Sequence, residues 1–514
     1  MRTSIALAVC LALSACGKPK DAEGWAKRAA SRARTDEKLE ALANVRKAPG
    51  DRRAAVPYLV KVLQQAPKAR GEAAVALGEI GDQSAVQPLI AALDTQARER
   101  EVLDANRHVA DALGQLRAKE AVPKLTELTS SADGYSQVAA VDALGNIGDP
   151  AAVETLVAVA TGERVEPFTA RKALLALGRI GDARAGPAVM KMLFEERPGV
   201  SFFPEASFAA VQIGKPLAEP LLAVLQGKDE KLASWAKEKG VLPGALFAKS
   251  AQLLGDVGGQ EAVPALVSKL SYRDSDPGIQ LYVRVFAAES LGRIRAKEAV
   301  RPLADLVGRE QDANVRDRYC DALVRIGDPA ALPALRAAAQ GAANWDLREG
   351  PLTAVSRLGT AAERPLIDAA RAKECAPKCA PAVDAAFAAM AARLDAAKEC
   401  TDVACWGRKL ADPRSAVRDR AALEIARTGG AAQAVALGDA IVQPVSDETD
   451  LAARYHTVLA LNWITAREKV GAGGEAIAAK IDAMIAQDRG RTLTAGVNDD
   501  ALRLATRLRR EARR

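Results

Sequence analysis

The chain has 514 residues, of which 49% are hydrophobic but only 4% aromatic, and it carries a formal net charge of +7. This length exceeds what one hydrophobic core supports, so the sequence predicts several domains or a repeat array. The charge permits attraction to acidic surfaces but lacks the concentrated basic stripe of nucleic-acid-binding proteins, and we expect no nucleic-acid partner.

The first sixteen residues, MRTSIALAVCLALSAC, have the layout of an export signal. Arg2 precedes an apolar run over residues 5–13 that is too short to span a bilayer. The run ends in LSAC, which resembles the lipobox of bacterial lipoproteins. The resemblance implies a lipid anchor on Cys16 and, because Gly17 is not Asp, sorting to the outer membrane. The alternative is an ordinary signal peptide that is cut nearby.

A phrase with a period of 31 to 44 residues recurs along the chain. It reads AVALGEIGDQSAVQPLIAAL from Ala74 and AVDALGNIGDPAAVETLVAV from Ala140. Its second glycine, or the equivalent residue, serves as a phase marker. The markers are Gly81, Arg117, Gly148, Gly181, Gly214, Gly258, Arg295, Gly327 and Gly359, with weaker units around Gly429 and Thr465. A period in this range indicates a helical solenoid.

Each unit predicts a helical hairpin. Ala74, Leu77 and Ile80 share one helical face, Gly81 suits the left-handed end of that helix, and Asp82 suits the cap of the next. A proline in the first turn of the second helix costs little, because its missing N–H would be unpaired there. One hairpin cannot bury its apolar stripe alone, so we expect neighbouring hairpins to stack.

The motif resembles HEAT repeats, most closely the short variety of the phycobilisome-lyase-type HEAT-like proteins, over roughly residues 36–485. The resemblance implies an all-α fold, an α-solenoid of about twelve HEAT-like helical hairpins. The expected organisation is a signal peptide at 1–15, a lipidated tether at 16–22, a solenoid at 23–495 with insertions around 194–206 and 226–247, and a basic C-terminal capping helix at 496–514.

No constellation of residues in the sequence predicts catalysis. The two histidines, His108 and His456, each lie nine residues before a marker, a position we expect on a solvated helix face. HEAT-repeat hydroxylases of the deoxyhypusine type carry repeated His-Glu pairs, whereas here Val109 and Thr457 follow the histidines. Phosphate-binding loops and nucleophile or metalloprotease motifs do not occur. We therefore expect no enzyme activity, no cofactor and no metal.

An arginine recurs eleven residues before the marker. The series comprises Arg70, Arg284, Arg316, Arg348, Arg418 and Arg454, and it is interrupted by Phe203 and Phe247. HEAT proteins are similar in using an arginine that bonds between neighbouring repeats, so we interpret the series as structural. The alternative is a basic ladder that binds a ligand.

The cysteines indicate an oxidising compartment. Cys10 is removed with the signal peptide. Cys320 lies at a repeat position that apolar residues occupy in other units, so we expect it to be a buried free thiol. The remaining four lie in ECAPKCAP and ECTDVACW, which a helix over residues 381–398 would hold roughly 27 Å apart. That separation predicts two local disulfides, Cys375–Cys379 and Cys400–Cys405. The alternative is a four-cysteine zinc site.

Aromatic residues gather where the repeat is longest, 44 residues between Gly214 and Gly258. Extra loops on a rigid solenoid commonly carry recognition elements, and aromatic side chains concentrate at binding hot spots. The residues that we expect to bind a partner are Phe202, Phe203, Trp235, Phe247 and Tyr272. The alternative is that these bulky side chains fill the core where the stack bends.

The C-terminal segment NDDALRLATRLRREARR is basic and amphipathic. Val497, Ala501, Leu504 and Leu508 form a narrow apolar stripe. We interpret the segment as a helix that caps the last repeat, with binding to anionic lipid as the alternative.

The sequence therefore predicts a scaffold for protein–protein interaction in the bacterial cell envelope. The scaffold would hold another envelope protein and would be attached through Cys16 to a membrane, most simply the outer membrane on its periplasmic side. The alternatives are a small-ligand-binding or lyase-type protein related to the bilin lyases, or a binder of anionic envelope lipid.

Overall fold

The computed structural model describes residues 19–471 and 473–512, so the predicted signal peptide and Cys16 lie outside the described residues. The chain divides into two compact units, unit 1 (Met1–Ala209) and unit 2 (Ala210–Arg514). The described residues of both units are almost entirely helical, with one two-stranded antiparallel hairpin that pairs β1 (Glu196–Arg197) with β2 (Val200–Ser201).

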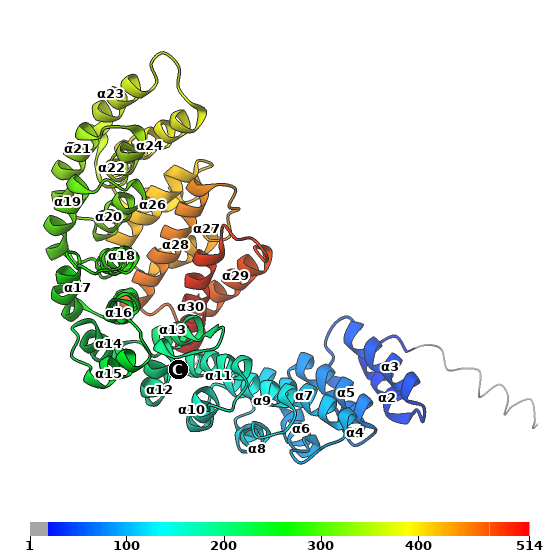
Figure 1. The fold of residues 1–514 in the computed structure, drawn as a ribbon. Coiled ribbons are helices and arrows are strands. Elements are labelled where there is room, and N and C mark those ends of the chain that lie inside the picture. The colour runs from blue at the N-terminus through cyan, green and yellow to red at the C-terminus, as the bar shows by residue number, and fades with distance from the viewer. Residues whose placement is uncertain (1–18, 472, 513–514) are drawn as a thin grey trace, which may run out of the picture. The chain divides into compact units, whose positions relative to one another are not determined.

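Unit 1 is built from helices joined pairwise into hairpins (Figure 1). Its helices are α2 (Ala22–Ser31), α3 (Thr35–Lys47), α4 (Val56–Leu63), α5 (Pro67–Ile80), α6 (Val86–Ala92), α7 (Arg100–Gln115), α8 (Val122–Leu128), α9 (Gly134–Ile147), α10 (Val153–Thr161), α11 (Pro167–Ile180) and α12 (Gly186–Phe194). Helix α13 (Phe203–Ile213) crosses the boundary between the units.

Unit 2 continues the same pattern to the C-terminus. Its helices are α14 (Ala218–Leu225), α15 (Glu230–Glu238), α16 (Pro243–Val257), α17 (Val263–Lys269), α18 (Pro277–Ile294), α19 (Val300–Arg309), α20 (Ala313–Ile326), α21 (Leu332–Gly341), α22 (Trp345–Leu358), α23 (Arg364–Glu374), α24 (Pro381–Glu399), α25 (Val403–Lys409), α26 (Ser415–Thr428), α27 (Ala434–Ala440), α28 (Glu448–Arg467), α29 (Gly473–Gln487) and α30 (Ala495–Ala512).

The hairpin ends follow the local chemistry of the repeated phrase. Gly81 ends α5 with a φ of 78°, in the left-handed region that glycine reaches without strain. The side chain of Asp82 then accepts from the backbone N–H of Ser84 and caps the short 3-10 turn that leads into α6. At two markers the residue is not glycine, yet Arg117 and Arg295 still take positive φ values of 53° and 60°.

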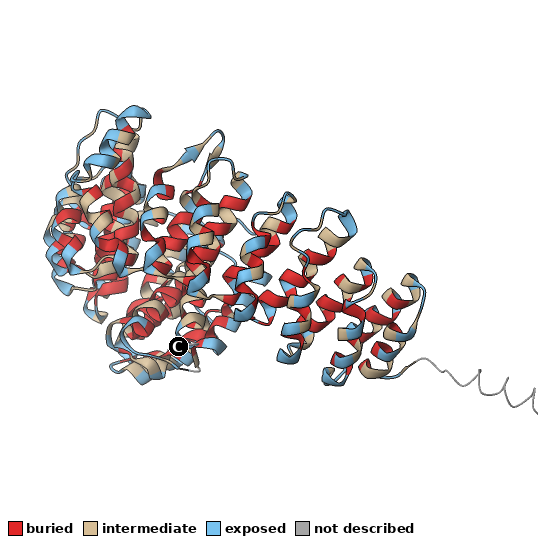
Figure 2. Cartoon of the chain, turned by 90° about the horizontal axis from the view of Figure 1, so that it is seen from below, coloured by how far each residue is buried: buried red, intermediate tan, exposed pale blue. Residues whose placement is uncertain are grey.

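The hairpins stack in two layers, with first helices on first helices and second helices on second helices. In unit 1, α5, α7, α9 and α11 pack consecutively, while α4 packs on α6 and α10 on α12. The stacking is close enough to require the earlier glycine of the phrase, because a Cβ on Gly145 would lie 2.7 Å from the Cβ of Ala176 in the next first helix. Buried residues accordingly face neighbouring helices, and exposed residues occupy the outer sides (Figure 2).

Two segments depart from the regular hairpin pattern, within residues 194–206 and 226–247. The β1–β2 hairpin occupies the first, and helix α15 occupies the second. Within the described residues no single helix is both long and apolar enough to cross a bilayer, although the bent pair Phe203–Ile213 and Lys215–Leu225 passes by length and composition.

Unit 2 closes on itself instead of forming an open arc. Its second helices α17, α19 and α21 form the outer layer, and α26, α28 and α30 lie on the inner side of α16 to α22 (Figure 1). The indole Nε1 of Trp463 on α28 donates to the carbonyl of Arg293 on α18 at 3.0 Å. The guanidinium of Arg295 donates to the carbonyl of Ala426 on α26 at 3.3 Å. The C-terminal helices therefore cover the inner face of unit 2.

Candidate functional site

The repeated arginines hold neighbouring structural elements together. Arg70 donates to the carbonyl of Leu63 at 3.0 Å, Arg284 to that of Tyr272 at 2.8 Å, and Arg348 to that of Ala339 at 3.1 Å. These carbonyls lie at or just beyond the C-terminal end of the preceding second helix, where a cation is favourable. The structural interpretation of the arginine series is confirmed by these bonds.

An arginine from the first insertion bonds the end of α10. The guanidinium of Arg197, on β1, donates to the carbonyls of Gly162 and Val165 at 3.0 and 2.8 Å. The same guanidinium lies 5.0 Å from the ring centroid of Phe202. Phe202 is fully buried. A partner-binding role for Phe202 therefore does not fit the structure, because its side chain packs inside unit 1.

His456 lies in a buried charged cluster. Asp419, on α26, has no exposed surface, and its Oδ2 accepts from the Nε atoms of Arg357 and Arg393, each at 2.9 Å. Its Oδ1 lies 2.5 Å from Nδ1 of His456 on α28. We refer to Asp419, Arg357, Arg393 and His456 as the Asp419 cluster. The expectation that His456 lies on a solvated helix face is wrong, because α26 and α28 pack against α22 and α24 when unit 2 closes.

The charges of the Asp419 cluster are set by burial and by the two arginines. The two guanidinium groups hold the pKa of Asp419 well below its ordinary value despite its burial, so the carboxylate is ionised. Burial lowers the pKa of His456, and the nearby Arg357 lowers it further, so the imidazole is neutral at pH 7. Both oxygens of Asp419 are used by these three side chains. We therefore assign the cluster a structural role.

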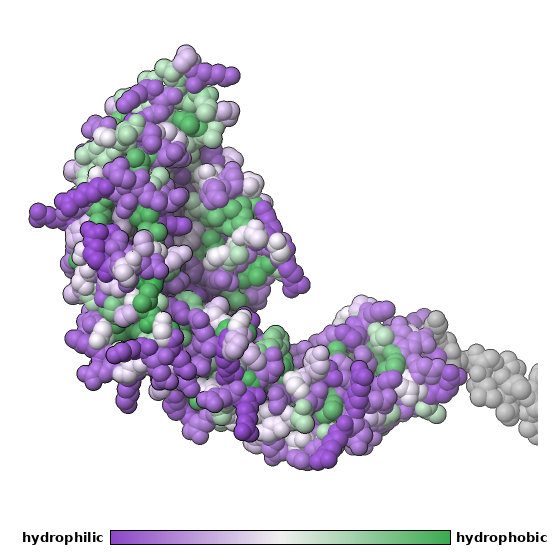
Figure 3. Space-filling model, viewed as in Figure 1, coloured by the Kyte–Doolittle hydropathy of each residue, from purple (hydrophilic) through white to green (hydrophobic). Residues whose placement is uncertain are grey.

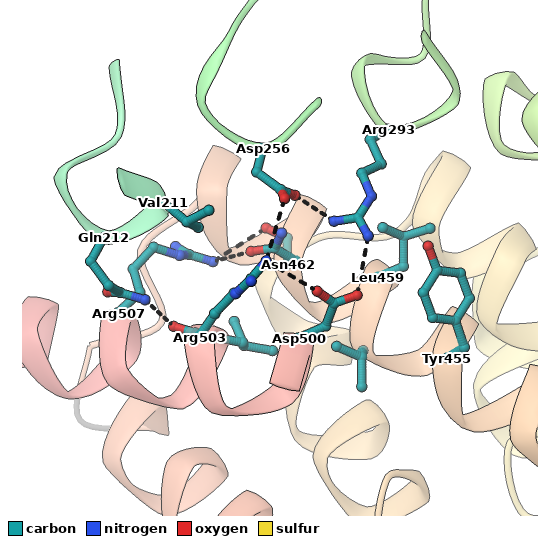
Figure 4. A pocket seen from close by; sticks show the side chains of 12 residues that line it. Val211, Gln212, Asp256, Arg293, Tyr455, Leu459, Asn462, Asp500, Arg503 and Arg507 are labelled. Carbon is teal, nitrogen blue, oxygen red and sulfur yellow. Dashed lines mark hydrogen bonds and ion pairs between the residues drawn. The ribbon is translucent and has the colours of Figure 1, made fainter. Parts of the chain in front are cut away.

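A small polar cavity lies where α30 meets α16, α18 and α28 (Figure 4). Arg293 bonds Asp256 at 2.6 Å and Asp500 at 3.2 Å, and Gln212 donates to the carbonyl of Arg503 at 2.8 Å. The cavity has a volume of about 40 Å³, enough for water but too small for an organic substrate. These ion pairs fasten α30 to the inner face of unit 2.

The remaining predicted aromatic residues lie in different places. Phe203 begins α13 and is half-buried in unit 1. In unit 2, the structure brings Phe247 and Tyr272 together edge to face, with ring centroids 5.7 Å apart, and places the ammonium of Lys269 3.6 Å from the Phe247 centroid. Trp235 is half-buried on α15. The predicted set is therefore divided between the two units.

The aromatic side chains with the highest exposed fractions among the described residues are ones that the sequence interpretation missed. Tyr135, Phe168 and Tyr282 are 70%, 53% and 57% exposed. Each lies thirteen residues before its marker on a first helix: Tyr135 and Phe168 in the first turns of α9 and α11, and Tyr282 in the second turn of α18. This shared phase is a signal in the sequence that could have identified them.

Two of these aromatic residues lie on successive first helices of unit 1. Tyr135 is the second residue of α9 and Phe168 the second residue of α11, and equivalent positions on stacked helices are about 10 Å apart. The guanidinium of Arg107 lies 5.0 Å from the Tyr135 centroid, and the ammonium of Lys172 lies 5.7 Å from the Phe168 centroid. We call Tyr135, Phe168, Arg107 and Lys172 the aromatic edge of unit 1.

The cysteines pair locally. The structure contains the disulfides Cys375–Cys379 and Cys400–Cys405, and Cys320 is a buried free thiol, as predicted. The alternative of a four-cysteine zinc site is not supported, because the four sulfur atoms are joined in two separate pairs and do not gather as thiolates.

The fold and these contacts define an α-solenoid of stacked helical hairpins. The chain contains HEAT repeats: the family model for HEAT repeats matches residues 100–167, 122–201 and 280–356, and the PBS lyase HEAT-like repeat matches residues 69–95. The resemblance to these repeats is confirmed. No curated protein gives a significant sequence match to the chain.

Several solved structures are similar in fold. A mutant of Kap121p is 12% identical, with a TM-score of 0.46, and the match covers 90% of this chain and 55% of that one. Kap95p, whose binding induces the switch loops of RanGDP to adopt the GTP-bound conformation, is 12% identical, with coverages of 96% and 77% and a TM-score of 0.47. The CpcE–CpcF complex of phycocyanin lyase from Nostoc sp. PCC7120 is 24% identical, with coverages of 53% and 94% and a TM-score of 0.27.

Proposed function

We propose that this protein is a lipid-anchored scaffold of the bacterial cell envelope that holds another envelope protein through the aromatic edge of unit 1. A solenoid of HEAT repeats offers long, rigid surfaces and is suited to binding proteins. The proposal includes no catalytic role and no cofactor.

One observation supports placing the binding site at the aromatic edge of unit 1. Tyr135 and Phe168 project from successive helices, each with a cation over its ring, and both are more than half exposed. Aromatic side chains contribute much contact area at little entropic cost, and arginine accompanies them at hot spots. In unit 2, by contrast, the C-terminal helices already occupy the inner face.

Two further observations support the location. The LSAC sequence that ends at Cys16 resembles a lipobox. Cys375–Cys379 and Cys400–Cys405 are local disulfides, which form and persist in oxidising compartments such as the periplasm.

The binding site is tested by crosslinking in intact envelopes. The double variant Tyr135→Ala/Phe168→Ala is expected to lose the crosslinked partner while its melting temperature stays unchanged, because both side chains are exposed. Tyr282→Ala is the matched control, since Tyr282 has the same repeat phase but lies in unit 2. Retention of the partner by the double variant would overturn this assignment of the site.

The anchor is tested separately. Cys16→Ser is expected to abolish labelling by a radioactive fatty acid and to release the protein from the outer-membrane fraction. A labelled band of unchanged intensity would refute the lipoprotein assignment and leave the aromatic edge to be judged on the crosslinking result.

A further inference from the structure

The second insertion builds a cavity in unit 2. Helix α15 lies between α14 and α16 along the chain, yet Ala236 is the only residue it buries. Because α15 does not pack tightly on its neighbours, a cavity of about 530 Å³ remains beneath it. This volume falls within the range of about 300–1,000 Å³ that is typical of small-molecule sites.

The walls of this cavity are almost entirely apolar. Val224 and Leu246 form part of its buried side, Leu232 and Ala236 line it from α15, and Leu242 stands at its edge with 44% of its surface exposed. Hydrophobic atoms reach the surface near α14 and α16 in the view of Figure 3. A cavity with such walls favours an apolar guest over water.

One aromatic wall of the cavity is fixed by its neighbours. Phe247 lines the cavity, and its ring is held edge to face by Tyr272 and contacted by the ammonium of Lys269. Burial lowers the pKa of Lys269, which agrees with its position against the two rings. The cavity is therefore partly preorganised and is not only a gap under a loose helix.

Two charged residues line the cavity, and they differ in their availability. The carboxylate of Asp229 caps α15 by accepting from the backbone N–H of Leu232 at 2.9 Å. Lys237, on the exposed side of α15, forms no ion pair within the described part of the chain. The mouth of an apolar cavity thus carries one available cation.

We propose that this cavity binds the hydrocarbon chain of a single-chain aliphatic carboxylate, whose carboxylate group pairs with Lys237. At roughly 30 Å³ for each water-sized group, the volume accommodates on the order of fifteen methylene groups, which is one acyl chain and not two. The site is separate from the aromatic edge of unit 1, so this proposal goes beyond the scaffold function and does not depend on it.

Titration of the purified full chain with dodecanoate tests the proposal. We expect saturable binding of one dodecanoate per chain. Decanoate should bind about fifteenfold more weakly, because it lacks two methylene groups and each buried methylene changes affinity roughly fourfold. Ala236→Phe places a ring inside the cavity and should abolish binding. The absence of saturable binding to the unmodified chain, or unchanged binding to Ala236→Phe, would overturn the proposal.

The carboxylate contact is tested on the surface, where folding is not at risk. Lys237→Ala should weaken dodecanoate binding at least tenfold and leave the binding of dodecanol unchanged. Lys239→Ala is the matched control, because Lys239 is exposed at the end of α15 and does not line the cavity. Equal loss with both variants would contradict a specific contact with Lys237. Binding of phosphatidylglycerol vesicles in place of dodecanoate would refute a single-chain ligand.

Discussion

Nδ1 of His456 lies 2.5 Å from Oδ1 of Asp419, and neither side chain has appreciable exposure to solvent. The contact joins α28 to α26, and the other oxygen of Asp419 reaches Arg357 on α22 and Arg393 on α24. One carboxylate therefore links four helices of unit 2. The closed arrangement of this unit depends on charges that are removed from water, which makes its stability sensitive to mutation and pH.

Removal of the Asp419 charge is expected to destabilise unit 2 strongly. Asp419→Asn leaves the buried guanidinium of Arg393 without a counter-charge and leaves that of Arg357 with Asp321 alone, so the free energy of unfolding should fall by about 3–5 kcal/mol. Urea denaturation followed by circular dichroism measures this loss. Asp395→Asn is the control, because Asp395 forms an exposed ion pair with Arg364 and should change stability by less than about 1 kcal/mol.

His456 is expected to make the protein less stable in mild acid. Its pKa in the folded chain lies below the ordinary 6.5, chiefly because of burial. As the pH falls below 6.5, the unfolded chain takes up a proton that the folded chain does not, so the free energy of unfolding decreases by up to about 1.4 kcal/mol per pH unit. The loss levels off below the folded pKa.

Denaturation of His456→Gln between pH 7 and pH 5 tests this slope. The free energy of unfolding of the variant should change less with pH in this interval than that of the unmodified chain. His108→Gln is the natural control, since the chain has only two histidines and His108 lies outside the Asp419 cluster. An unchanged slope in His456→Gln would show that another group titrates.

Asp317 is expected to give the opposite pH dependence: it should make the folded chain less stable as the pH rises. Burial, together with repulsion from Asp321 and Glu349, raises its pKa to about 7, and its Oδ1 has no hydrogen-bond partner among the described residues. Between pH 4 and pH 7 the unfolded chain loses this proton while the folded chain keeps it, so stability falls as the pH rises.

Asp317→Asn should therefore be more stable than the unmodified chain at pH 8 and close to it at pH 4. The gain at pH 8 is expected to be on the order of 1–2 kcal/mol, less than the full shift implies, because Asp317 is partly exposed and solvent screens its charge. Thermal melts at the two pH values measure it. Asp305→Asn, at an exposed position on α19, should show no such gain.

The sequence predicted the hairpins well because their determinants are local. Gly81 and Asp82 end one helix and cap the next with bonds that span a few residues. Closure of unit 2 depends instead on the accumulated twist of many hairpins, which no short segment encodes. The sequence signal for this closure is in α28, where the consecutive residues Val458, Leu459 and Ala460 face different sides of the helix and are all buried.

The candidate sites were predicted unevenly for a similar reason. The disulfides Cys375–Cys379 and Cys400–Cys405 are local and were identified from spacing alone. Phe202 was misjudged, because aromatic content does not reveal whether a side chain faces the core or the solvent. Tyr135 and Phe168 could have been found only by comparing the same phase across repeats.

Attachment of α30 to the inner face of unit 2 is expected to depend on Leu504. This side chain is almost fully buried, so Leu504→Ala should lower the free energy of unfolding by about 2–5 kcal/mol and accelerate amide hydrogen exchange in α30. Leu502→Ala is the matched control on the same helix, because Leu502 is 40% exposed. Equal exchange rates in both variants would contradict the packing of α30 described here.

The cysteines provide the most direct chemical test of unit 2. Peptide mapping without reduction should recover the links Cys375–Cys379 and Cys400–Cys405, and iodoacetamide should alkylate Cys320 only after unfolding. Burial raises the pKa of the Cys320 thiol, which suppresses the reactive thiolate in addition to blocking access.

Each disulfide closes a loop of only a few residues, so its loss should reduce the free energy of unfolding by at most about 2 kcal/mol in the chain-entropy model. The variant Cys375→Ala/Cys379→Ala should therefore remain folded at room temperature and melt at a lower temperature. Recovery of four alkylated cysteines at these positions from the unreduced native protein would contradict the disulfides and remove their support for an oxidising compartment.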